Sequence, residues 1–462
     1  MKQYEAIIIG SGQGGTPLAM KLAQQGWNVA LVEKQYAGGT CVNVGCTPTK
    51  TMIASAKVAY TVAQAGKWGV EVNDFKLHLP AVLERKRKVV ESFRQGSEKG
   101  MEETENLCFI RGEASFIDRK TLRVTLKDGG EETLSANKIF IDVGTRAALP
   151  DVAGLRETDY LTSTTLLELE EVPERLIILG GGYIGLEFGQ MYRRFGSQVT
   201  ILDHNQRLLP REDEDIAAEV LKFLEAEGIQ VITGAQTTKV QKEGKYLNVT
   251  LKIGDEERII TGSHILVSAG RTPNTDTLNL PAAGVELDKR GYIKANDRLE
   301  TSAPGIYAIG DVKGGPAFTH ISYNDYLILY ENLVEGKNDS IQNRMVPYTM
   351  FTDPQLGRVG ITEQEARKSN LNIKVATLPM AHVARAIEIG DTRGMMKAIV
   401  DAGTGKILGV AIVGQEGGEV MSVLQMAMVG NVTWRQIKDM VFAHPLYAES
   451  LNTLFMKLEK EE

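Results

Sequence analysis

The chain has 462 residues, of which 43% are hydrophobic and 24% charged, and its net charge is −7. This composition excludes a disordered, collagen-like or coiled-coil protein, and the length predicts roughly three domains. A mildly acidic chain without an apolar run of membrane-spanning length is expected to have neither nucleic acid nor a membrane as its main partner.

The first elements are predicted to form a βαβ unit. We expect a buried strand over 4–9, a helix near 14–25 and a strand over 28–33 that ends in Glu33. The turn after the first strand is rich in glycine, which lets the backbone approach a pyrophosphate at the positive N-terminus of the helix. A carboxylate at the end of the second strand accepts a hydrogen bond from an adenosine ribose. The loop glycines are Gly10, Gly12, Gly14 and Gly15.

The same pattern recurs further along the chain and predicts a second dinucleotide site. A strand begins near 175, a helix follows over 183–195, and the next strand ends in Asp203. An acidic residue there suits the free ribose of NADH and repels the extra phosphate of NADPH, whereas the nearby Arg207 opposes that preference. The loop glycines are Gly180, Gly182 and Gly185.

Two cysteines, Cys41 and Cys46, follow the first unit. Five residues of ideal helix rise about 7.5 Å, more than the roughly 7 Å that a disulfide spans, so a bridge needs an irregular first turn. Nearby glycines at 38, 39 and 45 allow that turn, and a helix N-terminus stabilises the thiolate that thiol–disulfide exchange requires. Two ordinary buried thiols and a metal site are the alternatives. No further Cys or His has suitable spacing, so we predict no metal site.

The rest of the chain supplies few further signals. Cys108 is expected to be a buried strand thiol, and three cysteines without a secretory signal pattern indicate a cytoplasmic protein. The segment 80–105 is predicted to be helical, with its basic run 85–88 as a solvated face. Short strands alternate with glycine turns over 229–268. Six methionines are expected to fill the core rather than to bind copper: Met380, Met395, Met396, Met421, Met426 and Met428.

Residues 38–50 resemble the redox signature of the FAD-dependent pyridine nucleotide-disulfide oxidoreductases. The segments 308–311, 144–146, 268–274 and 444–449 resemble, in turn, the second flavin motif, the hinge out of the flavin segment, the return from the nicotinamide segment and the C-terminal His-Pro motif. The resemblance covers essentially the whole chain. It implies FAD and NAD(P)H as cofactors, with NADH favoured by Asp203, and a homodimer.

The fold implied is α/β, with two Rossmann-like dinucleotide-binding domains and a C-terminal α+β dimerisation domain. We expect an FAD-binding domain over 1–150 and 271–345, an NAD(P)-binding domain over 151–270 and a dimerisation domain over 346–462. Beyond the loop residues already named, the resemblance assigns cofactor contacts to Lys34, Gly39, Thr40, Lys50, Gly144, Thr145, Tyr183, Ile184, Glu187, Gly270, Arg271, Gly310 and Asp311.

The resemblance also implies catalytic roles. Cys41 would be the interchange thiol that meets the acceptor, and Cys46 the thiolate against the flavin. Lys50 and Glu187 would pair near flavin N5, and Tyr183 would cover the nicotinamide side of the flavin. His444, oriented by Glu449, would act on Cys41 of the other subunit, because an imidazole exchanges a proton near neutral pH.

Within the family, the segments 46–51, 209–215 and 347–354 are most similar to the mercuric-reductase-like and reactive-chlorine-resistance flavoproteins. A small acceptor is therefore expected, either a metal ion such as Hg(II) or Cu(II) or an oxidant. Mercuric reductases carry a vicinal cysteine pair in their tail, whereas residues 454–462 contain no cysteine, which argues against efficient Hg(II) turnover. Dihydrolipoyl dehydrogenase is the alternative, followed by glutathione reductase and a redox-sensing flavoprotein module.

Overall fold

The N-terminal part of the chain forms a six-stranded sheet around β1 (Lys2–Ile9). The computed structural model describes residues 1–461. Strand β1 lies between β2 (Val29–Glu33) and β5 (Glu131–Ile141), both parallel to it. The remaining strands are β3 (Leu107–Asp118), β4 (Thr121–Leu126), which is antiparallel to β3 and β5, and β15 (Ile306–Ala308).

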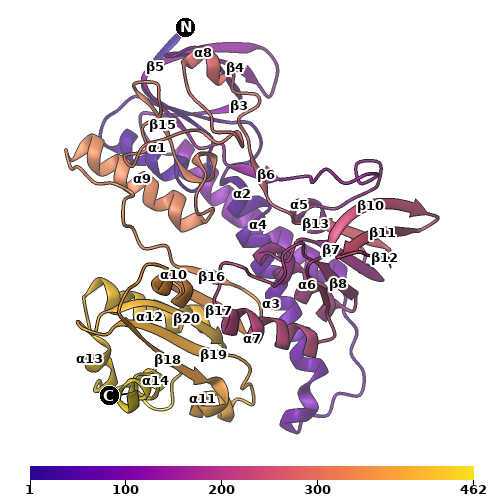
Figure 1. Ribbon diagram of the computed structural model, residues 1–462. Coiled ribbons are helices and arrows are strands. Elements are labelled where there is room, and N and C mark those ends of the chain that lie inside the picture. The colour runs from indigo at the N-terminus through magenta and orange to yellow at the C-terminus, as the bar shows by residue number, and fades with distance from the viewer. Residues whose placement is uncertain (462) are drawn as a thin grey trace.

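Helix α1 (Gly15–Gln24) packs on this sheet and completes the first βαβ unit. Its buried Leu18 and Leu22 share a core with Ala6 and Ile8 of β1. The predicted strand–helix–strand order is confirmed, and its bounds differ from the prediction by a residue or two. Figure 1 shows this sheet and α1 at one end of the molecule, near the N-terminus.

The second dinucleotide unit repeats this arrangement in a smaller sheet. Parallel strands stand in the order β13-β7-β8-β9, and a three-stranded antiparallel sheet, β10-β11-β12, lies beside them. The bounds are β7 (Arg175–Leu179), β8 (Gln198–Leu202), β9 (Gln230–Ile232), β10 (Gln236–Glu243), β11 (Tyr246–Ile253), β12 (Glu256–Gly262) and β13 (His264–Val267). Helices α5 (Ser163–Leu166), α6 (Tyr183–Phe195) and α7 (Glu214–Ala226) accompany them.

The chain leaves the first sheet and returns to it through one short ribbon. Strand β6 (Thr145–Ala147) pairs antiparallel with β14 (Arg271–Pro273). All of the second unit lies between these two strands in sequence, so both of its ends are held together at the ribbon. This pairing is what a discontinuous first domain requires.

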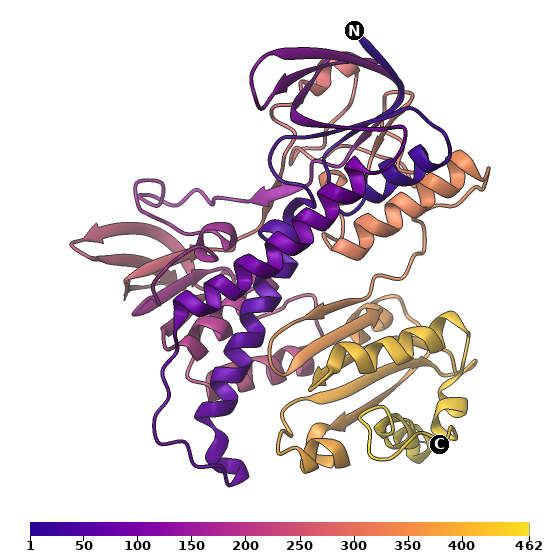
Figure 2. The same ribbon diagram turned by 180° about the vertical axis from the view of Figure 1, so that it is seen from behind.

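A five-stranded antiparallel sheet forms the C-terminal part, in the order β16-β17-β20-β19-β18. Figure 2 shows α12 lying across this sheet, and its buried Leu424 shares a core with Val410 and Ile412 of β20. The bounds are β16 (Tyr348–Met350), β17 (Gln355–Gly360), β18 (Ile373–Pro379), β19 (Met395–Asp401) and β20 (Ile407–Gly414). The helices are α10 (Glu363–Lys368), α11 (Ala384–Glu388), α12 (Gly417–Val429), α13 (Trp434–Lys438) and α14 (Ser450–Met456).

Two long helices, α3 (Cys46–Ala63) and α4 (Leu79–Glu102), connect these parts, and Figure 2 shows them packed side by side. Three further helices are α2 (Gly39–Asn43), α8 (Leu280–Ala283) and α9 (Thr319–Val334). Short 3-10 turns cover Ala65–Trp68, Gly310–Lys313, Met380–His382 and Lys457–Glu461. Among the helices of residues 1–461, none combines the length and apolar character that a bilayer span requires.

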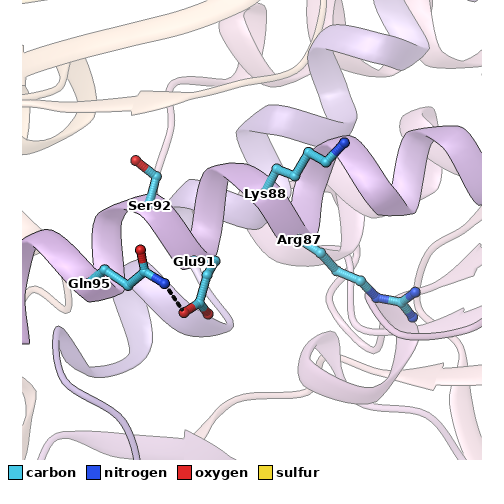
Figure 3. Close-up of a pocket in the computed structure, with 5 residues that line it drawn as sticks. All are labelled: Arg87, Lys88, Glu91, Ser92 and Gln95. Atoms are coloured by element: carbon cyan, nitrogen blue, oxygen red, sulfur yellow. Dashed lines mark hydrogen bonds between the residues drawn. The ribbon is translucent and has the colours of Figure 1, made fainter.

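The prediction that the basic run on α4 is a solvated face is wrong at Lys86. This side chain is 1% exposed, because helical spacing places it on the buried stripe of α4 between Leu83 and Val90. Its ammonium donates to the Leu167 carbonyl at 2.9 Å and pairs with Glu168. The prediction holds for Arg87 and Lys88, which are exposed, and Figure 3 shows their side chains projecting away from the helix.

Two other expectations need correction. Met426 on α12 is 73% exposed and fills no core, whereas Met380, Met396 and Met421 are buried as predicted. Met395 and Met428 are half-buried beside the core. Cys108 lies in β3 as expected, but it is half-buried rather than buried.

Candidate active site

The two cysteines come together because the chain breaks between two helices. Cys41 lies in α2 and Cys46 is the first residue of α3. Between them Gly45 approaches the preceding turn so closely that a Cβ there would lie 2.7 Å from the Thr40 carbonyl oxygen. Only glycine fits that approach, and the predicted irregular turn is confirmed. Both cysteines are free thiols in the structure, so the Cys41–Cys46 disulfide remains a prediction.

The two thiols differ in acidity. A hydrogen bond from Cys41, with smaller effects of Thr319 and Lys50, lowers the pKa of Cys46 to about 6, although burial opposes the shift. The same bond, together with burial, raises the pKa of Cys41. Near neutral pH the pair therefore holds one proton, on Cys41, and one negative charge, on Cys46 at the N-terminus of α3.

Thr319 is a site residue that the sequence analysis missed. It begins α9, 273 positions after Cys46, and its hydroxyl oxygen lies 3.4 Å from the Cys46 sulfur. No local motif marks this threonine. Only the approach of the N-termini of α9 and α3 brings the two side chains together.

Beside the thiols, Lys50 of α3 and Glu187 of α6 form the predicted pair. The Lys50 ammonium donates to one carboxylate oxygen of Glu187 at 2.7 Å. The other oxygen accepts the backbone amide of Phe351 at 2.8 Å, and the Lys50 ammonium lies 4.8 Å from the centre of the Phe351 ring. Phe351, which follows β16, thus holds the Lys50–Glu187 pair in place through its backbone amide and its ring.

The glycine loop before α1 has the features of a pyrophosphate site. Gly12 passes so close to Asp142 that a Cβ there would lie 2.6 Å from a carboxylate oxygen. That oxygen accepts the Gly15 amide at 2.7 Å. Within the described residues, the amides of Gly12 and Gln13 have no protein acceptor. Free amides at a helix N-terminus fit the pyrophosphate of a dinucleotide such as FAD.

Glu33 lies at this loop, where the sequence predicts the ribose ligand. One of its oxygens accepts the backbone amide of Ser11 at 2.9 Å and the Ser11 hydroxyl at 2.8 Å. The other accepts the Gln35 amide at 2.7 Å. The carboxylate is thus held in place at the end of β2 and is only partly buried, so it can still accept from a ribose hydroxyl.

A second group of predicted residues meets where the β6–β14 ribbon contacts the turn Gly310–Lys313. The Thr145 hydroxyl donates to Asp311 at 3.0 Å and accepts from Arg271 at 2.6 Å. The Arg271 guanidinium lies 3.8 Å from the Asp311 carboxylate. The Gly310 amide donates to the fully buried Asp325 at 2.8 Å, which anchors the turn that carries Asp311.

The second glycine loop has the same design. The Gly181 amide donates to Asp203 at 2.9 Å, and Gly182 has open space where a Cβ would stand. In the described part of the chain, the amides of Gly182 and Tyr183 have no protein acceptor. Asp203 also accepts the backbone and side-chain amides of Asn205, each at 2.8 Å. It is buried at the end of β8, in the position expected of the ribose ligand of NADH.

Tyr183, predicted to cover the nicotinamide pocket, stands in an aromatic cluster at the start of α6. Its ring centre lies 5.3 Å from that of Tyr348 and 6.4 Å from that of Phe318. The hydroxyls of both tyrosines donate to Glu212, that of Tyr183 at 3.4 Å. The sequence analysis missed Phe318, Tyr348 and Glu212, since they come from three separated segments.

His444 and Glu449 pair as predicted, but away from the thiols. The histidine Nδ1 lies 2.9 Å from a Glu449 oxygen, and its ring is largely exposed. Figures 1 and 2 place α14, which follows this pair directly, away from α2. Within residues 1–461, no hydrogen bond or ion pair joins His444 to either cysteine. The role of His444 at Cys41 of a second subunit therefore stays a prediction.

The other predicted contacts border these loops. Lys34 is exposed and lies 3.6 Å from Glu113, and Thr40 is exposed on α2. Gly39 begins α2 against Gly12, since a Cβ there would lie 2.9 Å from the Gly12 Cα. The remaining three are Gly144 before β6, Ile184 in α6 and Gly270 before β14.

The chain belongs to the pyridine nucleotide-disulphide oxidoreductase family. The family model matches residues 4–325, and the model of the family's dimerisation domain matches residues 346–455. The family is FAD-dependent and uses pyridine nucleotides. The chain is thus an oxidoreductase with the mixed α/β fold that the sequence predicted.

Three relatives show the range of the family. The chain is 38% identical to the probable pyridine nucleotide-disulfide oxidoreductase RclA of Escherichia coli, over 98% of this chain and 99% of that one. It is 35% identical to a mercuric reductase of Lysinibacillus sphaericus (99% and 83% covered) and 36% identical to a dihydrolipoyl dehydrogenase of Thermus scotoductus (100% and 98% covered).

One solved structure is similar over the whole chain. It is the Cu(II) complex of the HOCl-induced flavoprotein disulfide reductase RclA from Escherichia coli. Its TM-score to this chain is 0.90 at 38% identity, with 99% of this chain and 100% of that one covered.

Proposed function

We propose that this chain is an NADH-dependent flavoprotein reductase that passes electrons through Cys41 and Cys46 to a small metal ion or oxidant. The observation that carries the proposal is the geometry of the thiol pair: Cys41 lies in α2, and Cys46 lies at the N-terminus of α3 with the Thr319 hydroxyl 3.4 Å from its sulfur. A thiolate with a lowered pKa beside a protonated thiol is the reduced form that a redox-active disulfide needs. The acceptor class is supported by the similarity to RclA, of which one solved structure is a Cu(II) complex, and to mercuric reductases.

The cofactor contacts follow from the two loops. The free amides of Gly12 and Gln13 would bind the FAD pyrophosphate, Glu33 its adenosine ribose and Asp311 its ribityl chain. Asp203 would bind the ribose of NADH and disfavour the phosphate of NADPH. FAD, when bound, supplies the transfer of two electrons from the nicotinamide hydride to the disulfide.

The protein's own groups manage charge and protons. Two electrons and one proton break the Cys41–Cys46 bond and leave a thiol on Cys41 and a thiolate on Cys46. Because the pKa of Cys41 is raised, a base must take its proton before it attacks or binds the acceptor. The partner subunit's counterpart of His444, held by its glutamate, would be that base. Re-forming the disulfide returns two electrons, enough for one two-electron oxidant or for two Cu(II) ions.

The homodimer is part of this proposal. Besides the match to the dimerisation domain, the C-terminal part exposes apolar side chains, with Val441 95% exposed and Met426 73% exposed. Val429 and Leu446 are also exposed. Exposed apolar side chains of this kind are what a second copy of the chain would cover at a dimer interface. With only three cysteines in 462 residues, the chain carries no disulfide scaffold of the kind found in secreted proteins, and we propose that the enzyme works in the cytoplasm.

We propose the same division into domains that the sequence predicts. The FAD-binding domain would comprise 1–150 and 271–345, the NADH-binding domain 151–270 and the dimerisation domain 346–462. The β6–β14 pairing supports these bounds, because the chain leaves and re-enters the first part at adjacent strands.

Anaerobic NADH oxidation by the FAD-loaded enzyme tests the function, with Cu(II), thiol-complexed Hg(II), lipoamide and glutathione disulfide as acceptors. We expect fast turnover with a metal ion that Cys41→Ser abolishes and the control Cys108→Ser leaves unchanged. Fast lipoamide turnover would instead make the chain a dihydrolipoyl dehydrogenase, the function of one relative. Equal rates of wild type and Cys41→Ser would refute electron transfer through the thiols.

A further inference from the structure

A buried carboxylate lies between the second glycine loop and the five-stranded sheet. Glu212 precedes α7 and is completely buried. One of its oxygens accepts the hydroxyls of both Tyr183 and Tyr348. Its other oxygen lies 3.6 Å from Nε of Arg358, whose side chain is also buried. Three segments of the chain therefore meet at one acid.

The two tyrosines are held to Glu212 unequally. Tyr348 is fixed by the sheet, because it pairs with Arg358 in the register of β16 and β17. Tyr183 is the first residue of α6, and its hydroxyl bond to Glu212, at 3.4 Å, is the longer of the two. Glu212 is thus anchored on the side of the sheet, and its contact with Tyr183 is the one that breaks more easily.

The hydrogen bonding of this cluster is incomplete. Within residues 1–461, Nη1 and Nη2 of Arg358 and the second oxygen of Glu212 are buried without a hydrogen-bond partner. A buried donor without an acceptor destabilises the folded state, so the Arg358 guanidinium would gain free energy from a closer hydrogen bond to the Glu212 carboxylate. If Tyr183 swings away, Glu212 keeps its bond from Tyr348, and its second oxygen, now 3.6 Å from Nε of Arg358, can move into hydrogen-bond distance of the guanidinium, which offsets the lost bond.

We propose that Glu212 is a positioning residue that latches Tyr183 in its closed place over the nicotinamide pocket and releases it when the nucleotide binds. The inference rests on the proposed function, in which the Tyr183 ring covers the nicotinamide side of the flavin. A latch of this kind lowers the apparent affinity for the nucleotide, because only the open fraction of the enzyme can bind it. Loosening the latch should therefore tighten binding, which loss of a merely structural residue would not do.

The test is the dissociation constant of NAD⁺ for the FAD-loaded enzyme, measured by calorimetry. We expect Tyr183→Phe, which keeps the ring, to tighten binding about five- to tenfold, and Glu212→Gln to tighten it about threefold. In the double variant the gain should equal that of Tyr183→Phe alone, since the latch is already gone. The KM for NADH should fall in parallel with the dissociation constant.

Glu174→Gln is the matched control, since Glu174 accepts the hydroxyl of Tyr246 at 3.3 Å on the surface of the same region. Its NAD⁺ affinity should equal that of wild type. The latch would be overturned if a folded Glu212→Gln bound NAD⁺ as weakly as wild type or more weakly. It would also be overturned if the affinity gain of the double variant equalled the product of the two single gains. If Glu212→Gln does not fold, unchanged affinity in Tyr183→Phe decides against it.

The wild type separates this inference from the function on which it rests. A wild-type enzyme that oxidises NADH through Cys41 while the variant affinities stay unchanged refutes the latch alone. A wild-type enzyme that neither takes up FAD nor oxidises NADH refutes both.

Discussion

Replacing Thr319 by valine should raise the pKa of Cys46. The substitution keeps the volume and removes the hydroxyl that lies 3.4 Å from the Cys46 sulfur. A hydrogen bond to a charged group contributes about 1.5–3 kcal/mol, but this one is long and the Cys46 side chain is partly open, so we take about 0.7–1.4 kcal/mol. At 1.36 kcal/mol per pKa unit, the pKa of Cys46 should rise by about 0.5 to 1.

The sign follows from the direction of the shift. Because the pKa of Cys46 is lowered to about 6, its thiolate is present above that pH and lost as the pH falls through it. In Thr319→Val the loss should therefore begin at higher pH. The assay is a pH titration of the long-wavelength absorbance of the enzyme reduced by two electrons, which reports the thiolate beside the flavin.

Thr61→Val is the control, because the Thr61 hydroxyl donates to the Lys57 carbonyl at 2.9 Å within α3 and, among residues 1–461, makes no hydrogen bond to either thiol. Its midpoint should match that of wild type. A midpoint in Thr319→Val that moves by less than about 0.3, or that moves downward, would refute the role given to the hydroxyl.

Three further results are expected. Cys46→Ser should lose the long-wavelength absorbance of the two-electron-reduced enzyme, and survival of that band would reassign the thiolate. The ratio kcat/KM should be higher for NADH than for NADPH, and Asp203→Asn should narrow the difference; a preference for NADPH would show that Asp203 does not set the specificity. Lys86→Met should destabilise the protein by about 1–3 kcal/mol in urea unfolding, because the Leu167 carbonyl loses its buried donor. Lys88→Met, which breaks only an exposed pair, should cost at most about 0.5 kcal/mol, and equal effects of the two would contradict the burial of Lys86.

Sequence patterns predicted the parts of the fold that follow from short-range chemistry. Both βαβ units are encoded within about thirty residues each, by apolar strands, a glycine turn and a helix. Lys86 shows where a local pattern fails. Four consecutive basic residues predict a solvated face, yet helical spacing places Lys86 on the buried stripe of α4. There its ammonium donates to the Leu167 carbonyl and pairs with Glu168, both from another segment.

The active site was predictable to the extent that its residues lie in contiguous motifs. Cys41 and Cys46 fall in one such motif, and His444 and Glu449 in another. Thr319 was missed because it is an ordinary residue in an ordinary segment. Tyr348 and Glu212 lie in segments that carried the branch resemblance, but nothing in those segments gave either residue a role. Their roles arise only where helices and strands far apart in sequence converge, and no spacing in the chain encodes that convergence.

The central claim is that two cysteines store electrons alongside the flavin, and an anaerobic titration with NADH or dithionite tests it most directly. The FAD-loaded wild type should take up about four electrons per chain, two in the disulfide and two in the flavin, and Cys41→Ser about two. Uptake of about two electrons by both proteins would contradict the account, because Cys41 and Cys46 would then accept no electrons.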